Sequence, residues 1–268
     1  MAALVCVFPA CGFAAVEVLP ADFLFFPLLN PPREVSLDGS LLVTRRDLAR
    51  DFGSTHFEAD VAIGRQIPVV RFFSEEEGPS LELGFEVGVF ARFYLESTQR
   101  ELINADFRVG LPVSAARGRW RGRLTLLHVS SHLGDDFIAR FESFPRKILR
   151  DGVELLVAHV FSLGARAYAG GDFNFHRSPQ VEQAVARAGF EFEPSRELPL
   201  GLLLPVFGFE GRLDTQGRGT AIGTAGFSLR WLQSTVRLHL RGHYGPSPVG
   251  QLRRANETYL GLGLGFLS

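Results

Sequence analysis

Residues 81–96 read LELGFEVGVFARFYLE, and apolar side chains occupy every second position of this stretch. The apolar positions run from Leu81 to Leu95, and the positions between them are mostly charged or glycine: Glu82, Gly84, Glu86, Gly88, Arg92 and Glu96. Alternation with a period of two places one set on each face of a β-strand. The stretch is much longer than the roughly 5–6 residues of an ordinary soluble strand. It therefore predicts a transmembrane strand, whose apolar face meets lipid and whose polar face lines a lumen.

The same alternation recurs along the chain, in about twelve segments in all. With 81–96 they are 36–46, 54–71, 103–113, 119–132, 152–162, 166–176, 185–194, 200–214, 219–231, 235–244 and 259–266. We predict an all-β fold, a transmembrane antiparallel up-and-down β-barrel of about 12 strands that occupies residues 36–268. Closure of the barrel satisfies the backbone polar groups in lipid, where an open sheet edge would be costly.

A soluble β-sandwich also alternates and is the alternative fold. The length of the strands argues against it, and so does the full charge of the polar face. In a barrel these charges can pair across the lumen: Glu82, Glu86, Asp106 and Glu210 with Arg92, Arg108, Arg230, Arg237 and Arg241. A lumen of about twelve strands lies between small filled barrels and open porins. The sequence is therefore compatible with a plugged barrel and with a narrow channel.

The composition narrows the classes of function. The chain carries 28 Lys and Arg against 29 Asp and Glu, a formal net charge of -1. This balance lacks the basic surplus that nucleic-acid partners require. After the N-terminus no run of about 18 apolar residues occurs, which excludes helical membrane proteins. We therefore expect outer-membrane lipids, and not nucleic acid, as partners.

The two ends of the chain predict its compartment. Residues 1–14 (MAALVCVFPACGFA) are apolar, with Gly12 and Ala14 at the −3 and −1 positions of a signal-peptidase site. They predict a signal peptide followed by a periplasmic N-terminal segment over 15–35, and a buried N-terminal strand is the alternative. At the other end, 259–266 (YLGLGLGF) alternates and closes on an aromatic residue, which resembles the C-terminal signal of bacterial outer-membrane barrels. We predict the bacterial outer membrane as the location.

Loop lengths agree with the strand count. With both termini in the periplasm, every odd-numbered strand of the twelve runs outward. The connections near 114–118, 163–165 and 232–234 then lie on the periplasmic side, where turns are short. The longer connections 133–150 and 176–184 lie on the outside.

One predicted strand, 119–132, contains a candidate catalytic motif. The sequence there continues as WRGRLTLLHVSSHLGDD from residue 120, and by parity His128 and Ser130 share the apolar, lipid-facing side. Two residues along a strand span about 6.6 Å, which lets the His128 imidazole reach the Ser130 hydroxyl. A neighbouring base activates a serine nucleophile, and a third polar group orients that base. Asp151 and Glu142 are the candidates for this third role.

Two other interpretations of this region stay open. A calcium or zinc site at His128, His132, Asp135 and Asp136 is one of them. Asp135 and Asp136 offer the hard oxygen ligands that calcium prefers, so calcium is the candidate cofactor. His128 and His132 lie about 13 Å apart along a strand, which is too far for both to bind one metal ion. Alternatively, these polar side chains form an interfacial belt that meets lipid head groups and has no enzymatic role.

The His-x-Ser pair on a lipid-facing strand resembles that of outer-membrane phospholipase A, and also the dyad of the lipid A deacylases. The resemblance implies a lipid acyl-ester hydrolase with Ser130 as nucleophile and His128 as general base, oriented by Asp151 or Glu142. It also implies a homodimer as the active form. The phospholipase continues with Asn-Gly after its serine, whereas this chain continues with Ser131. The competing function is a non-enzymatic barrel, either a narrow channel or a structural surface protein.

Longer fragments carry a second resemblance over residues 17–267. They are VLPAD from Val18, PRE from Pro32, LINADFRVGLP from Leu102, SSHLGD from Ser130, Gly250-Gln251, and YLGLGL from Tyr259. Together they are similar to the bacterial family catalogued as domain of unknown function 1207. This resemblance implies an outer-membrane barrel and leaves its activity open.

Overall fold

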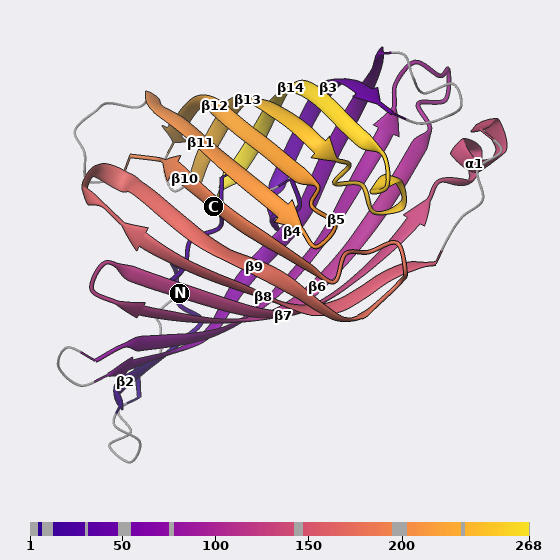
Figure 1. Cartoon of the computed structure of the whole chain (residues 1–268). Helices are drawn as coiled ribbons and strands as arrows, with labels where there is room; N and C mark the ends of the chain where they lie inside the picture. Colours follow the sequence, from indigo (N-terminus) through magenta and orange to yellow (C-terminus); the bar gives the residue numbers. More distant parts are fainter. Residues whose placement is uncertain are drawn as a thin grey trace.

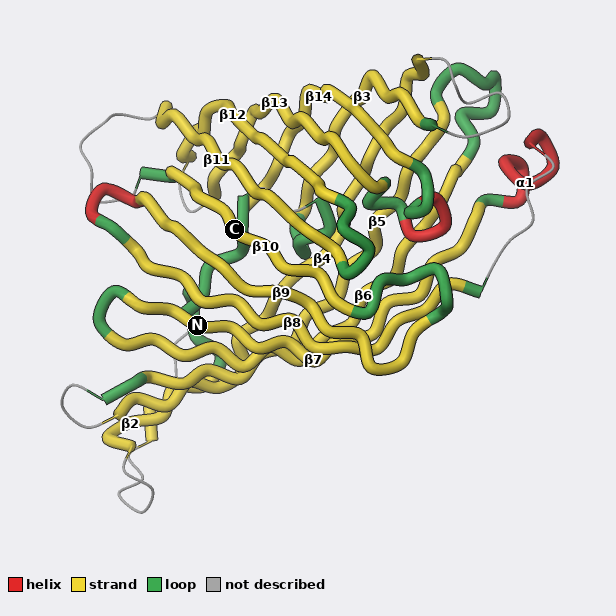
Figure 2. The backbone as a smooth tube through the Cα atoms, in the orientation of Figure 1, coloured by secondary structure: helices red, strands yellow, loops and turns green. Residues whose placement is uncertain are grey.

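The computed structural model of the chain describes residues 5–6, 13–29, 32–47, 55–74, 78–141, 147–194, 203–231 and 234–267. Most of these residues lie in antiparallel strands (Figures 1 and 2). The strands are β1 (Val5–Cys6), β2 (Phe13–Val18), β3 (Leu37–Arg46), β4 (Thr55–Ser74), β5 (Ser80–Tyr94), β6 (Leu102–Arg117), β7 (Trp120–Leu133), β8 (Ile148–Val160), β9 (Ala165–Arg177), β10 (Ala184–Phe192), β11 (Leu203–Asp214), β12 (Gly219–Trp231), β13 (Ser234–Pro246) and β14 (Asn256–Leu267). None of the helices in these ranges has the length and apolar character that a membrane span requires.

Strands β3 to β14 form a closed barrel of twelve strands, which confirms the predicted fold. Each strand pairs with its neighbours in sequence, and β14 returns to pair with β3, as in the pair Tyr259 and Thr44. Closure leaves none of these twelve strands as a free edge, as lipid requires of a spanning sheet. The short helical segments α1 (Asp135–Phe141), η2 (Ser162–Gly164) and η3 (Gly250–Leu252) lie in the connections between strands (Figure 2).

The two ends of the barrel differ in their connections, as the sequence predicts. At one end the connection after β6 is only Gly118 and Arg119, and the connection after β8 is the η2 turn. The opposite end carries the longer connections that contain α1 and η3. We call these the turn end and the loop end. Beyond the barrel wall at the turn end, β2 pairs with the last residues of β4 and β1 pairs with β2 (Figure 1).

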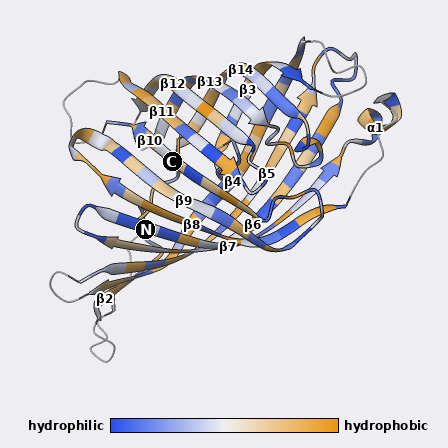
Figure 3. Cartoon of the chain, in the orientation of Figure 1, coloured by the Kyte–Doolittle hydropathy of each residue, from blue (hydrophilic) through white to orange (hydrophobic). Residues whose placement is uncertain are grey.

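The outer wall is largely apolar and the inner wall is polar, so the predicted alternation is confirmed. Hydrophobic and hydrophilic residues alternate along the strands (Figure 3). Along β5, Leu83, Phe85 and Val87 are exposed on the outer wall, whereas Glu82 and Glu86 are buried on the inner wall. A side chain on the outer wall of such a barrel meets lipid and one on the inner wall does not. The period of two therefore sorts these residues of β5 correctly between the two environments.

Ion pairs fill the inner wall towards the loop end. The Arg92 guanidinium is fully buried and contacts Glu58 at 2.9 Å, Asp60 at 3.0 Å and Glu257 at 3.1 Å. Arg46 bonds the same Glu58 and lies 2.6 Å from Glu257. A buried charge is tolerated only where such partners compensate its desolvation. Charges therefore pair inside the barrel, but mostly with other partners than the sequence predicts. Glu86 pairs with Arg108 as predicted, whereas Glu82 pairs with Arg71 and Arg92 pairs with none of the four predicted carboxylates. Arg46 and Arg92 are each shared between carboxylates of two strands.

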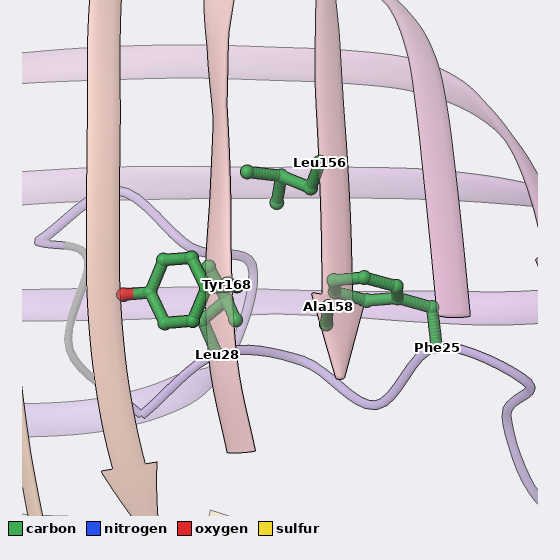
Figure 4. Close-up of a cluster of buried hydrophobic side chains, with 5 residues drawn as sticks. All are labelled: Phe25, Leu28, Leu156, Ala158 and Tyr168. Carbon is green, nitrogen blue, oxygen red and sulfur yellow. The ribbon is translucent and has the colours of Figure 1, made fainter. Parts of the chain in front are cut away.

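The N-terminal segment continues this filling towards the turn end. Phe25 and Leu28 are buried against Leu156 and Ala158 of β8 and Tyr168 of β9 (Figure 4). The Arg123 guanidinium lies over the Phe25 ring, 4.9 Å from its centroid. Phe25 and Leu28, which belong to the predicted periplasmic segment 15–35, therefore lie inside the lumen. A lumen of this width has more room than its own side chains fill, and the segment supplies the missing packing.

Two charged residues hold this segment in place. Arg33 Nε donates to Asp106 Oδ2 at 3.1 Å, and its Nη1 lies 3.3 Å from Asp60. Glu34 accepts two hydrogen bonds from Arg123, at 2.6 and 3.1 Å. We call residues 20–29 and 32–36 the lumen segment. Through Arg33 and Glu34 the segment thus supplies charge partners to Asp60, Asp106 and Arg123 of the inner wall.

The predicted cleavage point after Ala14 falls inside β2. Residues on both sides of this point belong to one strand, in which Val18 pairs with Val70 of β4. The described residues of the predicted signal peptide, 5–6 and 13–14, thus lie in strands β1 and β2. The signal peptide stays a prediction.

Candidate functional site

Strand β7 presents His128 and Ser130 on the outer wall, as parity predicts. The His128 side chain is 54% exposed, and Ser130 is half-buried. Opposite them on β6 lie Val109 and Phe107, both exposed on the same wall. The dyad therefore lies between apolar neighbours, and no hydrogen bond joins its two members within the described chain.

Asp151 of β8 lies directly opposite His128. Its Oδ1 is 2.5 Å from Nδ1 of the imidazole. Because an ionised carboxylate only accepts hydrogen bonds, this contact places a proton on Nδ1 and leaves Nε2 as the free acceptor. The structure thus brings His128 and Asp151 into contact and places Ser130 on the same wall, two residues along β7. The fourth residue that the sequence nominated for a hydrolase, Glu142, lies outside the described residues.

A second histidine, which the sequence analysis did not nominate, contacts the same carboxylate. Nδ1 of His176 in β9 lies 2.6 Å from Asp151 Oδ2. We call His128, Asp151 and His176 the outer polar cluster. It spans three neighbouring strands of the outer wall.

A β-bulge explains why parity misses His176. Asp151 pairs with His176, but the next residue, Gly152, pairs with Asn174, so Phe175 is an extra residue in β9. Asn174 points inward and is buried, whereas Phe175 and His176 are both exposed on the outer wall. Strict alternation would have placed His176 in the lumen with Asn174. A bulge redirects a side chain in this way, and bulges are frequent next to active sites.

Glycine at position 152 allows the bulge. A Cβ atom there would lie 2.6 Å from the carbonyl oxygen of Phe173 and 2.7 Å from Asn174 Oδ1. A glycine inside a strand often marks such a close approach of two backbones. The sequence signal for His176 was therefore present, as a glycine next to Asp151, but it does not name the partner strand.

The residue next to the dyad, Ser131, points the opposite way and has a structural role. Its hydroxyl donates to Asn104 Oδ1 at 2.9 Å, and Asn104 in turn donates to Asp106 at 2.8 Å. Gln251 of η3 donates to the Ser131 carbonyl at 2.8 Å, and the Gly250 amide donates to Asp106 at 3.2 Å. The motif SSHLGD is thus divided by the strand: Ser131 holds the loop end together, while Ser130 faces outward.

The two candidate calcium ligands, Asp135 and Asp136, are exposed in the first turn of α1. Acidic residues at this position stabilise a helix through its dipole, which is a structural reason for both. Among the described residues, no three His, Cys, Asp or Glu side chains converge on one point as metal ligands. The calcium site at these two residues stays a prediction.

The helix itself is anchored to the barrel rim. Phe137 packs against Ile103, and Arg140 Nε donates to the buried Glu101 carboxylate at 2.9 Å. This hydrogen bond raises the pKa of the Arg140 guanidinium. The contact holds α1 beside the loop end of β7.

Solved structures resemble this fold over most of its length. The outer membrane phospholipase A from Escherichia coli aligns with a TM-score of 0.58 and 14% identity, over 87% of this chain and 90% of that one. The phospholipase dimer with bound calcium from Salmonella typhi aligns with a TM-score of 0.56 and 13% identity, over 93% and 94% of the two chains. At these identities the likeness shows the fold, that of an outer-membrane β-barrel.

Sequence comparison supports the second resemblance. No curated protein matches the chain. The sequence model of one family matches residues 5–267, which is nearly the whole chain. The chain belongs to the family described as "Protein of unknown function (DUF1207)".

Proposed function

We propose that the protein is an outer-membrane lipid acyl-ester hydrolase whose catalytic group is Ser130, with His128 as base and Asp151 as its orienting residue. The observation that carries this proposal is the 2.5 Å contact between His128 and Asp151 on the outer wall. Ionisable side chains that face lipid are expensive and are usually functional. This pair occurs beside a serine, on a wall whose other exposed residues are largely apolar.

The location follows from the fold and from the orientation of the barrel. Short turns face the periplasm in barrels of this kind, and longer loops face outward. On this basis the turn end lies in the periplasm and the loop end lies outside. His128 and Ser130 belong to the half of β7 nearer the loop end. The ester groups of lipids in the outer leaflet would then lie beside the dyad.

The chemistry assigns one role to each residue. Ser130 Oγ attacks the ester carbonyl carbon, and its proton passes to His128 Nε2 as the new C–O bond forms. The proton on His128 Nδ1 stays on the ring, and Asp151 accepts its hydrogen bond and stabilises the imidazolium that results. The ester C–O bond then breaks, and the leaving alcohol takes the proton from His128. Water repeats the same sequence on the acyl-serine and releases a fatty acid.

The similar Salmonella protein was solved as a dimer with bound calcium. We propose a homodimer here too, in which a second chain would complete any calcium site near Asp135 and Asp136. The roles of Ser130, His128 and Asp151 need no metal. Calcium is therefore varied in the assay.

The test measures acyl release from phospholipid and from lipid A by the refolded barrel, with and without calcium. Ser130→Ala and His128→Ala should each lower the rate by about 10³-fold or more, because the members of a triad act as a unit. Ser131→Ala is the matched control, since the neighbouring hydroxyl faces the lumen. It should keep the rate per folded molecule.

A folded, dimeric wild-type protein that releases no fatty acid from either lipid would end the hydrolase proposal. The non-enzymatic alternatives would then compete. Of these, a structural surface protein fits better than a narrow channel, because the lumen segment and the ion pairs of Arg92 and Arg123 fill the interior.

A further inference from the structure

The outer polar cluster contains one residue, His176, that a serine triad does not require. His176 is on the outer wall because the bulge at Phe175 places it there. Its side chain is 68% exposed, and within the described chain its hydrogen bond is to Asp151. A side chain this exposed contributes little packing, so the stability of the barrel does not explain its position.

Asp151 is held from both sides as a result. Its Oδ1 faces His128 at 2.5 Å and its Oδ2 faces His176 at 2.6 Å. The terminal torsion of an aspartate is broad, so a carboxylate with one partner can rotate about it. Two N–H donors on the two oxygens restrict that rotation and keep Oδ1 directed at His128.

We propose that His176 is a positioning residue of the hydrolase, acting through Asp151 and not on the substrate. This inference rests on the proposed function and deepens it. When His128 accepts the proton of Ser130, the carboxylate that stabilises the imidazolium is already aligned. Alignment that precedes the reaction lowers its barrier, because no reorganisation remains to be done.

The test compares His176→Ala with His176→Asn. The alanine variant removes the donor, whereas the asparagine Nδ2 lies the same number of bonds from Cα as the histidine Nδ1 and can still donate to Oδ2. We expect His176→Ala to lower kcat by about tenfold with KM unchanged, the size typical of residues that orient a catalytic ligand. His176→Asn should restore kcat to within about threefold of wild type.

His159→Ala is the matched control. His159 also faces outward, at the turn end of β8, where its ring packs against Trp120. Its loss should leave kcat within about twofold, because it touches no member of the cluster. Ring-nitrogen NMR of the ¹⁵N-histidine-labelled barrel provides a readout that does not depend on activity, and it should show protonated Nδ1 on both His128 and His176.

Each result separates this inference from the proposed function. If wild type is active and His176→Ala matches it, the positioning role is wrong and the hydrolase stands. A rise in KM at constant kcat would also overturn it, because His176 would then contact the substrate. An asparagine variant as slow as the alanine variant would contradict the hydrogen-bond argument. If wild type itself is inactive, the proposed function fails and this role fails with it.

Discussion

Strands β7 and β8 carry polar residues on both walls, and the two sets differ in what surrounds them. On the inner wall, Glu154 is buried between Arg123 at 3.0 Å and Arg187 at 3.4 Å, and Ser131 is bonded to Asn104. On the outer wall, His128 and Asp151 contact each other, and Asp151 also contacts His176. Within the described residues, the inner side chains have partners throughout the lumen, whereas the hydrogen bonds of these three outer side chains are to one another.

This difference shows where charge indicates function in a barrel. Inner-wall charges are numerous because the lumen must be filled and each arginine needs its carboxylates. They are explained by the fold alone. Outer-wall charge has no such explanation, since an apolar side chain would meet lipid at lower cost. Three residues on the outer wall are therefore more informative about activity than the many charges inside.

The largest effects are expected when two carboxylates of β8, one on each wall and three residues apart, are replaced one at a time by the corresponding amide. Asp151→Asn on the outer wall should lower acyl release by about 10⁴-fold, because the amide no longer holds His128 in the working tautomer. Glu154→Gln on the inner wall should lower the free energy of unfolding by about 3–5 kcal/mol, because it leaves buried arginines without their charge partner. Acyl release and urea unfolding in the same detergent measure both effects.

If the two walls have different roles, the outer-wall variant should lose activity without losing stability, and the inner-wall variant should lose stability without losing activity. Asp151→Asn should keep the unfolding free energy of wild type within about 0.5 kcal/mol. The folded fraction of Glu154→Gln should keep wild-type activity. A Glu154→Gln barrel that unfolds like wild type would show that the lumen charges are not the structural network described here.

Much of this arrangement is readable from the sequence, because a period of two is a local property. Parity places His128 and Ser130 outward and Ser131 inward, and the structure agrees. Asp151 was one of two candidates for the third role, and strand pairing brings it opposite His128. The twelve strands follow from the same alternation, since each one repeats it.

Two features could not be predicted from the sequence, because both depend on contacts between segments that are distant in the chain. His176 reaches the outer wall only through the register shift between β8 and β9, which no local pattern of β9 reveals. The lumen segment has no alternation, so the sequence gives no sign that Phe25 packs on Tyr168 or that Glu34 bonds Arg123. Both features require knowledge of which strand or segment lies opposite.

A weaker test concerns the lumen segment, which joins the inner-wall network without being part of the wall. Replacing both Arg33 and Glu34 with alanine should lower the unfolding free energy by about 2–3 kcal/mol, less than a break within the wall, because Arg123 keeps Glu154. The amide of Leu28, which donates to Glu34 at 3.3 Å, should exchange its hydrogen about tenfold faster or more. Hydrogen exchange followed by mass spectrometry measures this locally.

Asp22→Ala is the control for that variant. Asp22 pairs with Arg71 at 2.8 Å, but its side chain is 67% exposed, so its loss should cost less than about 0.5 kcal/mol. Unchanged exchange at Leu28 in the double variant would mean that these charges do not anchor the segment.

The smallest expected effect compares the unfolding free energies of two glycine-to-alanine variants, one with its new methyl group against inner-wall side chains and one with it on the outer wall. A Cβ atom on Gly250 of η3 would lie 2.5 Å from Asp106 Oδ1 and 2.7 Å from Ser131 Cβ, inside the network that closes the loop end. Gly250→Ala should therefore cost about 1 kcal/mol through overpacking. Gly223 of β12 faces outward, and a Cβ atom there meets nothing within 4 Å. Gly223→Ala should be neutral or slightly stabilising, because alanine loses less backbone entropy on folding. Equal unfolding free energies for the two variants would mean that Ser131 and Asp106 yield easily, and that the inner wall is less tightly packed than its hydrogen bonds indicate.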